Sequence, residues 1–97
     1  MRIEVVSEGA ISQQARAYAE YRVFAALAPY SEAEKVQHVS VFLRPITIVA
    51  ECESVACTVT VALERSNTLH IQTTGPHAYA AINRAVDRIR TARPSEE

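Results

Sequence analysis

The feature that most constrains this chain is an alternation of inward apolar positions with mostly polar positions along several short segments. Residues 38–44, 57–64 and 69–73 alternate in this way, and residues 2–5 begin the chain with the same pattern. Period-two alternation is typical of β-strands that bury one face. Between the last two segments, residues 65–67 are Arg-Ser-Asn, which is a turn-forming composition. The sequence therefore predicts four strands, the last two of which form a hairpin.

Two further segments predict helices. Residues 13–28 contain neither glycine nor proline, and Ser12 can cap their first turn, so we expect a helix that ends at Pro29. A second helix is expected to begin with Pro76 at its first helical position and to end at Pro94. Each segment carries an apolar stripe at three- and four-residue spacing, which predicts one buried face. The stripes are Ala15, Tyr18, Ala19, Val23, Ala26 and Leu27, and Ala78, Ile82, Ala85, Val86, Ile89 and Ala92.

The order of these segments predicts an α+β fold of the form β-α-β-β-β-α. A right-handed crossover through the first helix makes the first two strands parallel, which gives a four-stranded mixed sheet with two helices packed on one face. The apolar phase flips at Pro45, so a bulge or strand end is expected there, and residues 51–54 are expected to form a polar loop. We interpret residues 1–94 as a single domain and 95–97 as a frayed acidic tail.

Composition excludes several classes of protein. The chain has 97 residues, enough for one core. No run approaches the roughly 18 apolar residues that a membrane span requires. Glu4 stands where a signal peptide would continue its apolar stretch, so we expect a cytoplasmic protein with no membrane partner. The formal net charge of −1 argues against an indiscriminate polyanion binder, and DNA is not an expected partner.

Residues that could carry catalysis or bind a metal are sparse. Cys52 and Cys57 have a C-x4-C spacing, which is not a zinc pair, and no second Cys or His pair follows. Cys57 has the phase of an inward strand residue, whereas Cys52 falls in the expected loop. The serines lack a G-x-S-x-G elbow, and two glycines are too few for a phosphate-cradling loop. We therefore expect no catalytic residue, no metal, no cofactor and no enzymatic activity.

The distribution of charge is more informative than its total. Between Pro76 and Arg93 there are four arginines and one aspartate, a local charge of +3. The four are Arg84, Arg88, Arg90 and Arg93. Arginines on a helix face form either a solvated surface or a contact surface for RNA phosphates. Both interpretations remain open from the residues alone.

Three stretches of the chain carry a family resemblance. The first is Ile11-Ser12-Gln13-Gln14-Ala15-Arg16-Ala17-Tyr18, followed by Arg22, and the second is Val39-Ser40-Val41-Phe42-Leu43-Arg44. The third comprises Leu69-His70-Ile71, Gly75, Tyr79-Ala80-Ala81-Ile82-Asn83 and Asp87-Arg88-Ile89. Together they resemble the short form of the ribosome hibernation promoting factor and ribosome-associated inhibitor family, also called sigma-54 modulation proteins. The likeness spans essentially the whole chain.

This resemblance implies a function. Members of the family bind the small ribosomal subunit in the channel used by mRNA and tRNA, and so silence translation during starvation. The resemblance places ribosomal RNA against the basic positions that match, which are Arg16, Arg22, Arg44 and Arg88. Arg84, Arg90 and Arg93 add charge on or near the same helix without a position-by-position match. All seven are candidate RNA-binding residues.

Two alternatives follow from the residues. The chain departs from the family in its acidic end, Pro94 to Glu97, and in Asn83, which replaces the usual Asp. These departures and the near-neutral charge favour a protein-interaction module on the same fold, which could form a homodimer by pairing through the uncovered sheet face. A small hydrolase or ligand binder would need a buried pocket beside His38 and His70. The uncovered face is expected to carry His38, Ser40, Phe42, Arg44, Thr58, Thr60, Glu64, His70 and Gln72.

Overall fold

The computed structural model describes residues 2–33, 36–49, 52–63 and 68–91, and it contains two helices and four strands. Side chains are described for these residues except 30–33, 47–49 and 52–53. In chain order the elements are β1 (Arg2–Ser7), α1 (Gln13–Ala33), β2 (Val36–Val49), β3 (Cys52–Leu63), β4 (Leu69–Gly75) and α2 (Ala78–Thr91). The expected turn at 65–67 and the expected tail at 95–97 lie outside the described residues.

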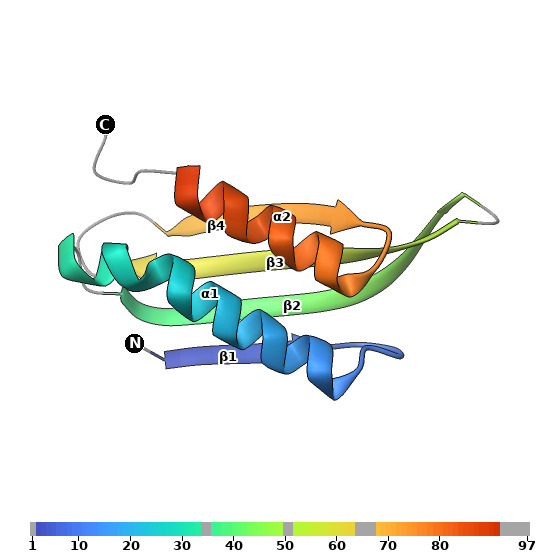
Figure 1. The fold of residues 1–97 in the computed structure, drawn as a ribbon, viewed down its shortest axis with the longest axis horizontal. Coiled ribbons are helices and arrows are strands. Elements are labelled where there is room, and N and C mark those ends of the chain that lie inside the picture. Colours follow the sequence, from blue (N-terminus) through green and yellow to red (C-terminus); the bar gives the residue numbers. More distant parts are fainter. Residues whose placement is uncertain (1, 34–35, 50–51, 64–67, 92–97) are drawn as a thin grey trace.

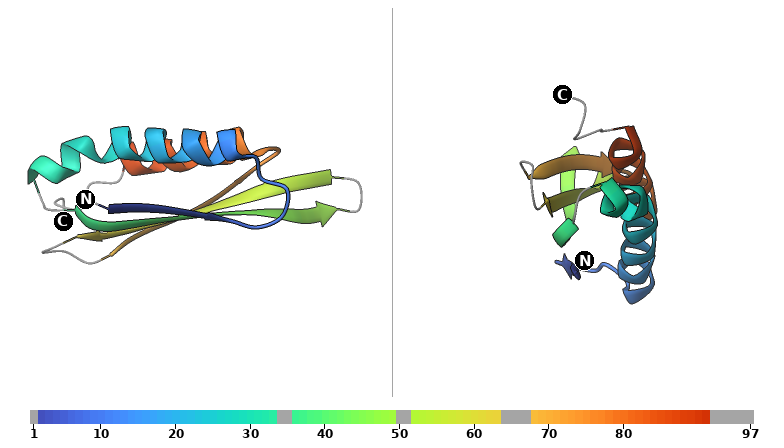
Figure 2. Two further views of the ribbon diagram at one scale, coloured as in Figure 1. Left: turned by 90° about the horizontal axis from the view of Figure 1, so that it is seen from below. Right: turned by 90° about the vertical axis from the view of Figure 1, so that its left-hand side faces the viewer.

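The predicted β-α-β-β-β-α fold is confirmed. The strands form one sheet in the order β1-β2-β3-β4, so β1 and β4 are its two edges (Figure 1). β1 is parallel to β2, while β2 with β3 and β3 with β4 are antiparallel. Both helices lie side by side on one face of the sheet and leave the other face uncovered (Figure 2). The molecule therefore has two layers, and each sheet edge lies beside a different helix.

The core lies between the helices and the covered sheet face. The alternation predicted for the strands is confirmed, because Val39, Val41 and Leu43 are fully buried while Arg44 is exposed. Both predicted helix stripes are likewise buried or half-buried throughout their described residues. Fully buried side chains of the centre include Leu27, Leu43, Ile82, Ile89, Val23, Val59 and Val86.

The first helix is longer than predicted. Ser12 caps it as expected, since its Oγ accepts a hydrogen bond from the Ala15 N–H at 3.0 Å. The prediction that Pro29 ends the helix is wrong, because α1 continues through Pro29 to Ala33. A proline removes the hydrogen bond to the carbonyl four residues earlier. Here that carbonyl belongs to Ala25, which lies on the exposed side of α1, where water can replace the missing donor.

The second strand also continues through its proline. The prediction of a strand end or bulge at Pro45 is wrong, because the register with β3 is unbroken there and shifts only beyond Thr47. The Leu43 carbonyl accepts from the Glu8 N–H, so residues of this parity direct their backbone groups toward β1. Pro45 also faces the β1 side of β2, but it lies past the end of β1. The N–H that proline lacks is therefore not needed for pairing with β1. The prediction of a polar loop at 51–54 is wrong for residues 52–54, which belong to β3, while residue 51 lies outside the described residues.

The second helix begins two residues later than predicted. Pro76 precedes the helix instead of occupying its first position, and α2 starts at Ala78. The residue between them, His77, caps the helix: its Nδ1 accepts from the Ala80 N–H at 3.2 Å. Gly75 allows β4 to approach this helix closely, because a Cβ there would lie 2.7 Å from the backbone nitrogen of Ala81. The end of β4 and the start of α2 are thus tightly joined.

Candidate nucleic-acid interface

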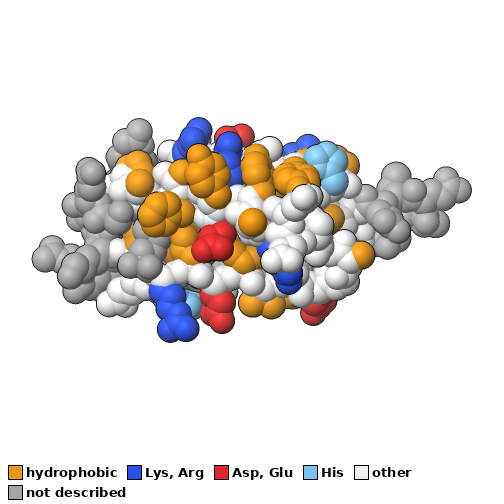
Figure 3. Space-filling model, turned by 60° about the horizontal axis from the view of Figure 1, so that its bottom comes forward, with side chains coloured by type: hydrophobic (Ala, Val, Ile, Leu, Met, Phe, Trp, Pro, Cys, Tyr) orange, Lys and Arg blue, Asp and Glu red, His pale blue; other side chains and the backbone are white. Residues whose placement is uncertain are grey.

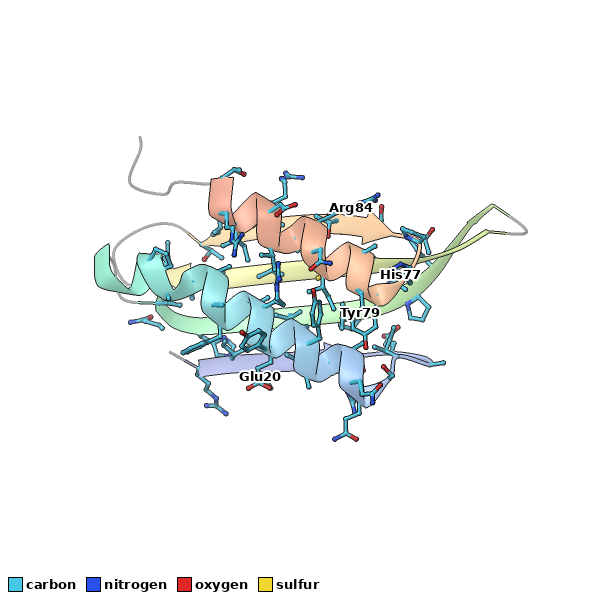
Figure 4. All side chains as sticks on the ribbon, viewed as in Figure 1. Glu20, His77, Tyr79 and Arg84 are labelled. Carbon is cyan, nitrogen blue, oxygen red and sulfur yellow. The ribbon has the colours of Figure 1, made fainter. Side chains whose placement is uncertain are left out.

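The outer edge of β4 is occupied by an arginine. No other described strand lies beside β4 on this side, so its outward backbone groups have no ladder partner within the described sheet. Arg84, on the first turns of α2, donates from Nη1 to the Thr74 carbonyl at 2.7 Å (Figure 4). This distance is typical of a strong, charge-assisted hydrogen bond. Arg84 therefore joins the helix layer to the sheet edge, and its remaining N–H groups are still available to a ligand.

Three of the predicted RNA-binding arginines converge around this edge. Arg44 comes from the uncovered face of β2, whereas Arg84 and Arg88 come from α2 on the covered face. They line one shallow, open hollow of about 730 Å3 that wraps around β4. Its other lining residues are Ile46, Ala56, Gln72, Thr73, Thr74 and Asp87. Basic side chains from both faces of the sheet thus border a single surface.

The hollow has an excess of positive charge. Asp87 is the one acidic residue among the described residues that line it. Within the described ranges, none of the three arginines forms an ion pair with a carboxylate. Arg44, Arg84 and Arg88 are all exposed, so their guanidinium groups face solvent. Guanidinium groups in this state are suited to bidentate contacts with phosphate oxygens.

The other predicted arginines are not part of this hollow. Arg16 lies at the opposite side of the molecule, where its Nη1 is 3.5 Å from Ser7 Oγ in β1. Arg22 lies over the Tyr18 ring, 5.7 Å from its centroid, and makes a cation–π contact there. Arg90 is exposed on α2 but does not line the hollow, and Arg93 lies outside the described residues. The seven predicted residues are therefore not one continuous patch.

The two helices are joined by polar and aromatic contacts that the sequence did not indicate. Tyr18 of α1 donates its hydroxyl hydrogen to Asn83 Oδ1 of α2 at 2.7 Å. The Tyr18 and Tyr79 rings meet edge to face, with centroids 5.0 Å apart. Asn83, which replaces the family's usual Asp, still supplies the oxygen that this contact requires. These contacts fix the orientation of α2, and with it the positions of Arg84 and Arg88.

The uncovered face does not resemble a catalytic or metal centre. Thr60 Oγ1 and His70 Nδ1 share a hydrogen bond of 3.2 Å, and His38 Nε2 lies 3.4 Å from Glu4 Oε1. Among the residues whose positions are described, no group of three His, Cys, Asp or Glu could hold a metal ion. Phe42 is the aromatic predicted on this face, and it is only half-exposed. The described side chains of this face therefore form a polar surface with two side-chain contacts.

Cys57 is part of the core. It is fully buried in β3, as its strand phase predicted, and desolvation raises the pKa of its thiol from 9.0 to about 12. A thiol in this state is protonated at physiological pH and is a poor nucleophile. Cys52 lies at the start of β3 and not in the predicted loop.

The sequence and the fold can now be compared with known proteins. The family model described as "Sigma 54 modulation protein / S30EA ribosomal protein" matches residues 3–92. The chain belongs to this family. The resemblance predicted from the sequence is thereby confirmed, and the family is one of ribosome-associated proteins.

A solved structure has the same fold. It is described as a ribosomal subunit interface protein from Coxiella burnetii, and its TM-score with this chain is 0.75. The identity is 16%, over 94% of this chain and 91% of the other. No curated protein is similar enough in sequence to match. Among the described residues, no helix is long and apolar enough to cross a membrane.

Proposed function

We propose that this chain is a non-catalytic translation regulator that binds ribosomal RNA of the small ribosomal subunit. Membership of a ribosome-associated family supports a ribosomal partner. The name of the similar structure, a ribosomal subunit interface protein, supports binding at the face where subunits meet. The observation that carries the proposal is the convergence of Arg44, Arg84 and Arg88 on one exposed hollow.

The hollow suits a folded phosphate backbone better than a base sequence. Its arginines project from two faces of the sheet, so they can reach phosphates that approach from different directions. The aromatic residues needed to stack several bases are not found on the described part of the uncovered face, where Phe42 is half-exposed. Binding would therefore depend on shape and phosphate position. The affinity would fall by about one logarithmic unit per contacted phosphate for each tenfold rise in salt concentration.

The regulatory effect would be steric. A rigid two-layer domain held at the subunit interface would occupy the path of mRNA and tRNA, and no reaction is needed for that. We propose that this occurs in the cytoplasm under stress, when translation must be silenced reversibly. The modest number of arginines in the hollow is consistent with release when salt or competing ligands change.

Co-sedimentation with purified small ribosomal subunits tests the proposal. The protein should sediment with subunits at low salt and dissociate progressively as salt is raised. Arg44→Glu combined with Arg88→Glu should weaken the complex by about a hundredfold, because two phosphate contacts become repulsive. Arg88→Glu is preferable to Arg84→Glu here, since Arg84 also holds the edge of β4.

The matched control is Arg2→Glu. Arg2 is an exposed arginine on the uncovered face of β1, at the opposite edge of the sheet from the hollow. The Arg2→Glu substitution changes the net charge by the same amount as Arg88→Glu but should leave co-sedimentation unchanged. Equal loss in Arg2→Glu and Arg88→Glu, or no co-sedimentation of the unmodified protein at low salt, would refute binding through the hollow.

A further inference from the structure

The edge formed by β1 is open, unlike the edge formed by β4. β1 pairs with β2 on one side, and no strand among the described residues lies on the other. Glu8 donates its N–H to Leu43 of β2, so the alternate residues Ile3, Val5 and Ser7 direct their backbone groups away from the sheet. An edge of this kind can accept another strand. In Figure 2 the β1 edge is the dark blue strand beside the N-terminus.

The helix beside this edge exposes apolar side chains. Tyr21 and Phe24 of α1 are 70% and 55% exposed. With the exposed Ala17 and Ala28 they form a stripe at positions i, i+4, i+7 and i+11, on a different side of α1 from its buried face. A groove lined by Ile3, Ala17, Glu20, Tyr21 and Phe24 connects this stripe to β1. Figure 3 shows hydrophobic side chains gathered on this side of the molecule.

We propose that a second copy of this chain docks on this surface, with the two β1 strands antiparallel and the two α1 helices side by side. The two four-stranded sheets would then form one continuous sheet across a two-fold axis. We infer a second copy because the surface is self-complementary. In a two-fold interface the same patch of both subunits meets, so each residue must fit a residue of the same patch. Both the strand and the helix meet that requirement.

The charges of β1 match when the axis passes through Ile3. Ile3 then exchanges both backbone hydrogen bonds with the Ile3 of the partner copy, because its N–H and C=O point outward. In the same register Arg2 lies directly opposite Glu4 of the partner copy, twice by symmetry. Such non-hydrogen-bonded cross-strand pairs bring side chains close together, and opposite charges there are favourable. Glu4 is 57% exposed beside His38, so it is accessible for this contact.

The stripe on α1 is also symmetric. Tyr21 lies four positions after Ala17, Phe24 lies three positions after Tyr21, and Ala28 lies four positions after Phe24. In an antiparallel pair, each Tyr21 therefore faces a Phe24 and each Ala17 faces an Ala28. The small residues at the ends allow the helices to approach, while the aromatic rings fill the centre. Glu20 points from α1 toward the outer side of β1 (Figure 4). Its negative charge opposes close approach of the second copy at this one point of the groove.

Sedimentation equilibrium of the full chain over a wide concentration range tests this proposal. We expect a reversible monomer–dimer equilibrium, with Phe24→Glu monomeric at concentrations where the unmodified protein is dimeric. Arg2→Glu and Glu4→Arg should each weaken the dimer by about tenfold, because two attractive pairs become repulsive. The double variant, Arg2→Glu with Glu4→Arg, restores opposite charges and should recover the dimer. Circular dichroism spectra should be the same for all variants, which are exposed substitutions.

Several results would overturn the proposal. One is a monomer at all concentrations reached, and another is a dimer that Phe24→Glu leaves intact. Failure of the double variant to recover the dimer would exclude this register. If the protein is monomeric but an added extended peptide binds to β1 and protects its amides from exchange, the surface accepts a different protein instead of a second copy. Because Arg44 and Arg88 lie at the other edge, none of these results depends on ribosome binding.

Discussion

The two edges of the sheet differ in how they are closed and in what surrounds them. At β4 the Arg84 side chain donates a hydrogen bond to an outward backbone carbonyl, and the neighbouring surface carries guanidinium groups. At β1 the outward backbone groups are left open, and the neighbouring surface carries exposed aromatic rings. The difference teaches that the two edges of one small sheet can carry unlike surfaces: guanidinium groups at β4 and exposed apolar side chains at β1.

The contrast originates in the helices. α2 has a buried stripe of alanine, isoleucine and valine, and arginines border it on the side near β4. α1 is less strongly segregated, because apolar residues occur on its outer side as well as on its buried side. Tyr18 and Asn83 connect the two helices, so the two surfaces are held in a fixed relation. The following experiments challenge or refine this contrast, beginning with the largest expected effect.

The glycines at the two edges should respond unequally to substitution. Gly75→Ala should lower the free energy of unfolding by about 3 kcal/mol, because the new Cβ would meet the backbone of α2. Gly9→Ala, near the end of β1, should cost about 1–2 kcal/mol, since its φ of +66° is unfavourable for alanine. The neighbour it would meet is the Pro45 ring, which can shift more readily than a backbone. Urea unfolding measures both, and an equal loss would show that β4 is no more tightly joined than β1.

Two arginines at the β4 edge separate stability from binding. Arg84→Ala should lower the free energy of unfolding by about 1 kcal/mol, because the Thr74 carbonyl loses its donor. Arg88→Ala, the matched control on the same helix, should change it by less than about 0.5 kcal/mol. Both should reduce the salt-dependent binding to small subunits. If Arg88→Ala destabilises the protein as much as Arg84→Ala, the edge is held by general charge and not by that hydrogen bond.

Cys57 reports which edge opens first. It lies in β3 opposite Thr73 of β4, so separation of β4 would expose it while separation of β1 would not. In a Cys52→Ser background, thiol labelling should be slow in the unmodified protein and faster in Arg84→Ala. Unchanged labelling in Arg84→Ala would mean that β4 does not open locally.

Because the pKa of the Cys57 thiol is raised from 9.0 to about 12, the thiol stabilises the fold below pH 9, and this contribution is lost as the pH rises toward 12.

Most of the fold could be predicted from the sequence because side-chain periodicity reports burial directly. The strands and both helix stripes follow from it. Predictions based on prolines failed at Pro29, Pro45 and Pro76. The predictions at Pro29 and Pro76 considered only the missing N–H, and the prediction at Pro45 added the change of apolar phase. Whether that N–H is needed depends on neighbours distant in sequence, such as the end of β1 next to Pro45.

The site was only partly predictable for a related reason. Arg44, Arg84 and Arg88 were named, but Arg44 lies on the opposite sheet face from the two helix residues. Their convergence requires that β4 is the edge and is short, which no local pattern encodes. Tyr21 and Phe24 were not identified as a surface feature from the sequence, although both are exposed on α1. Their positions outside the buried stripe of α1 were the available signal for exposure.

The hydrogen bond from Arg84 to Thr74 has a consequence for how the protein responds to its ligand. The same guanidinium group holds a strand in place and faces the surface where phosphates would bind. A bound anion would restrict the motion of that side chain and so keep the strand from separating. Occupancy of the hollow should then be measurable as slower amide exchange along the whole of the last strand.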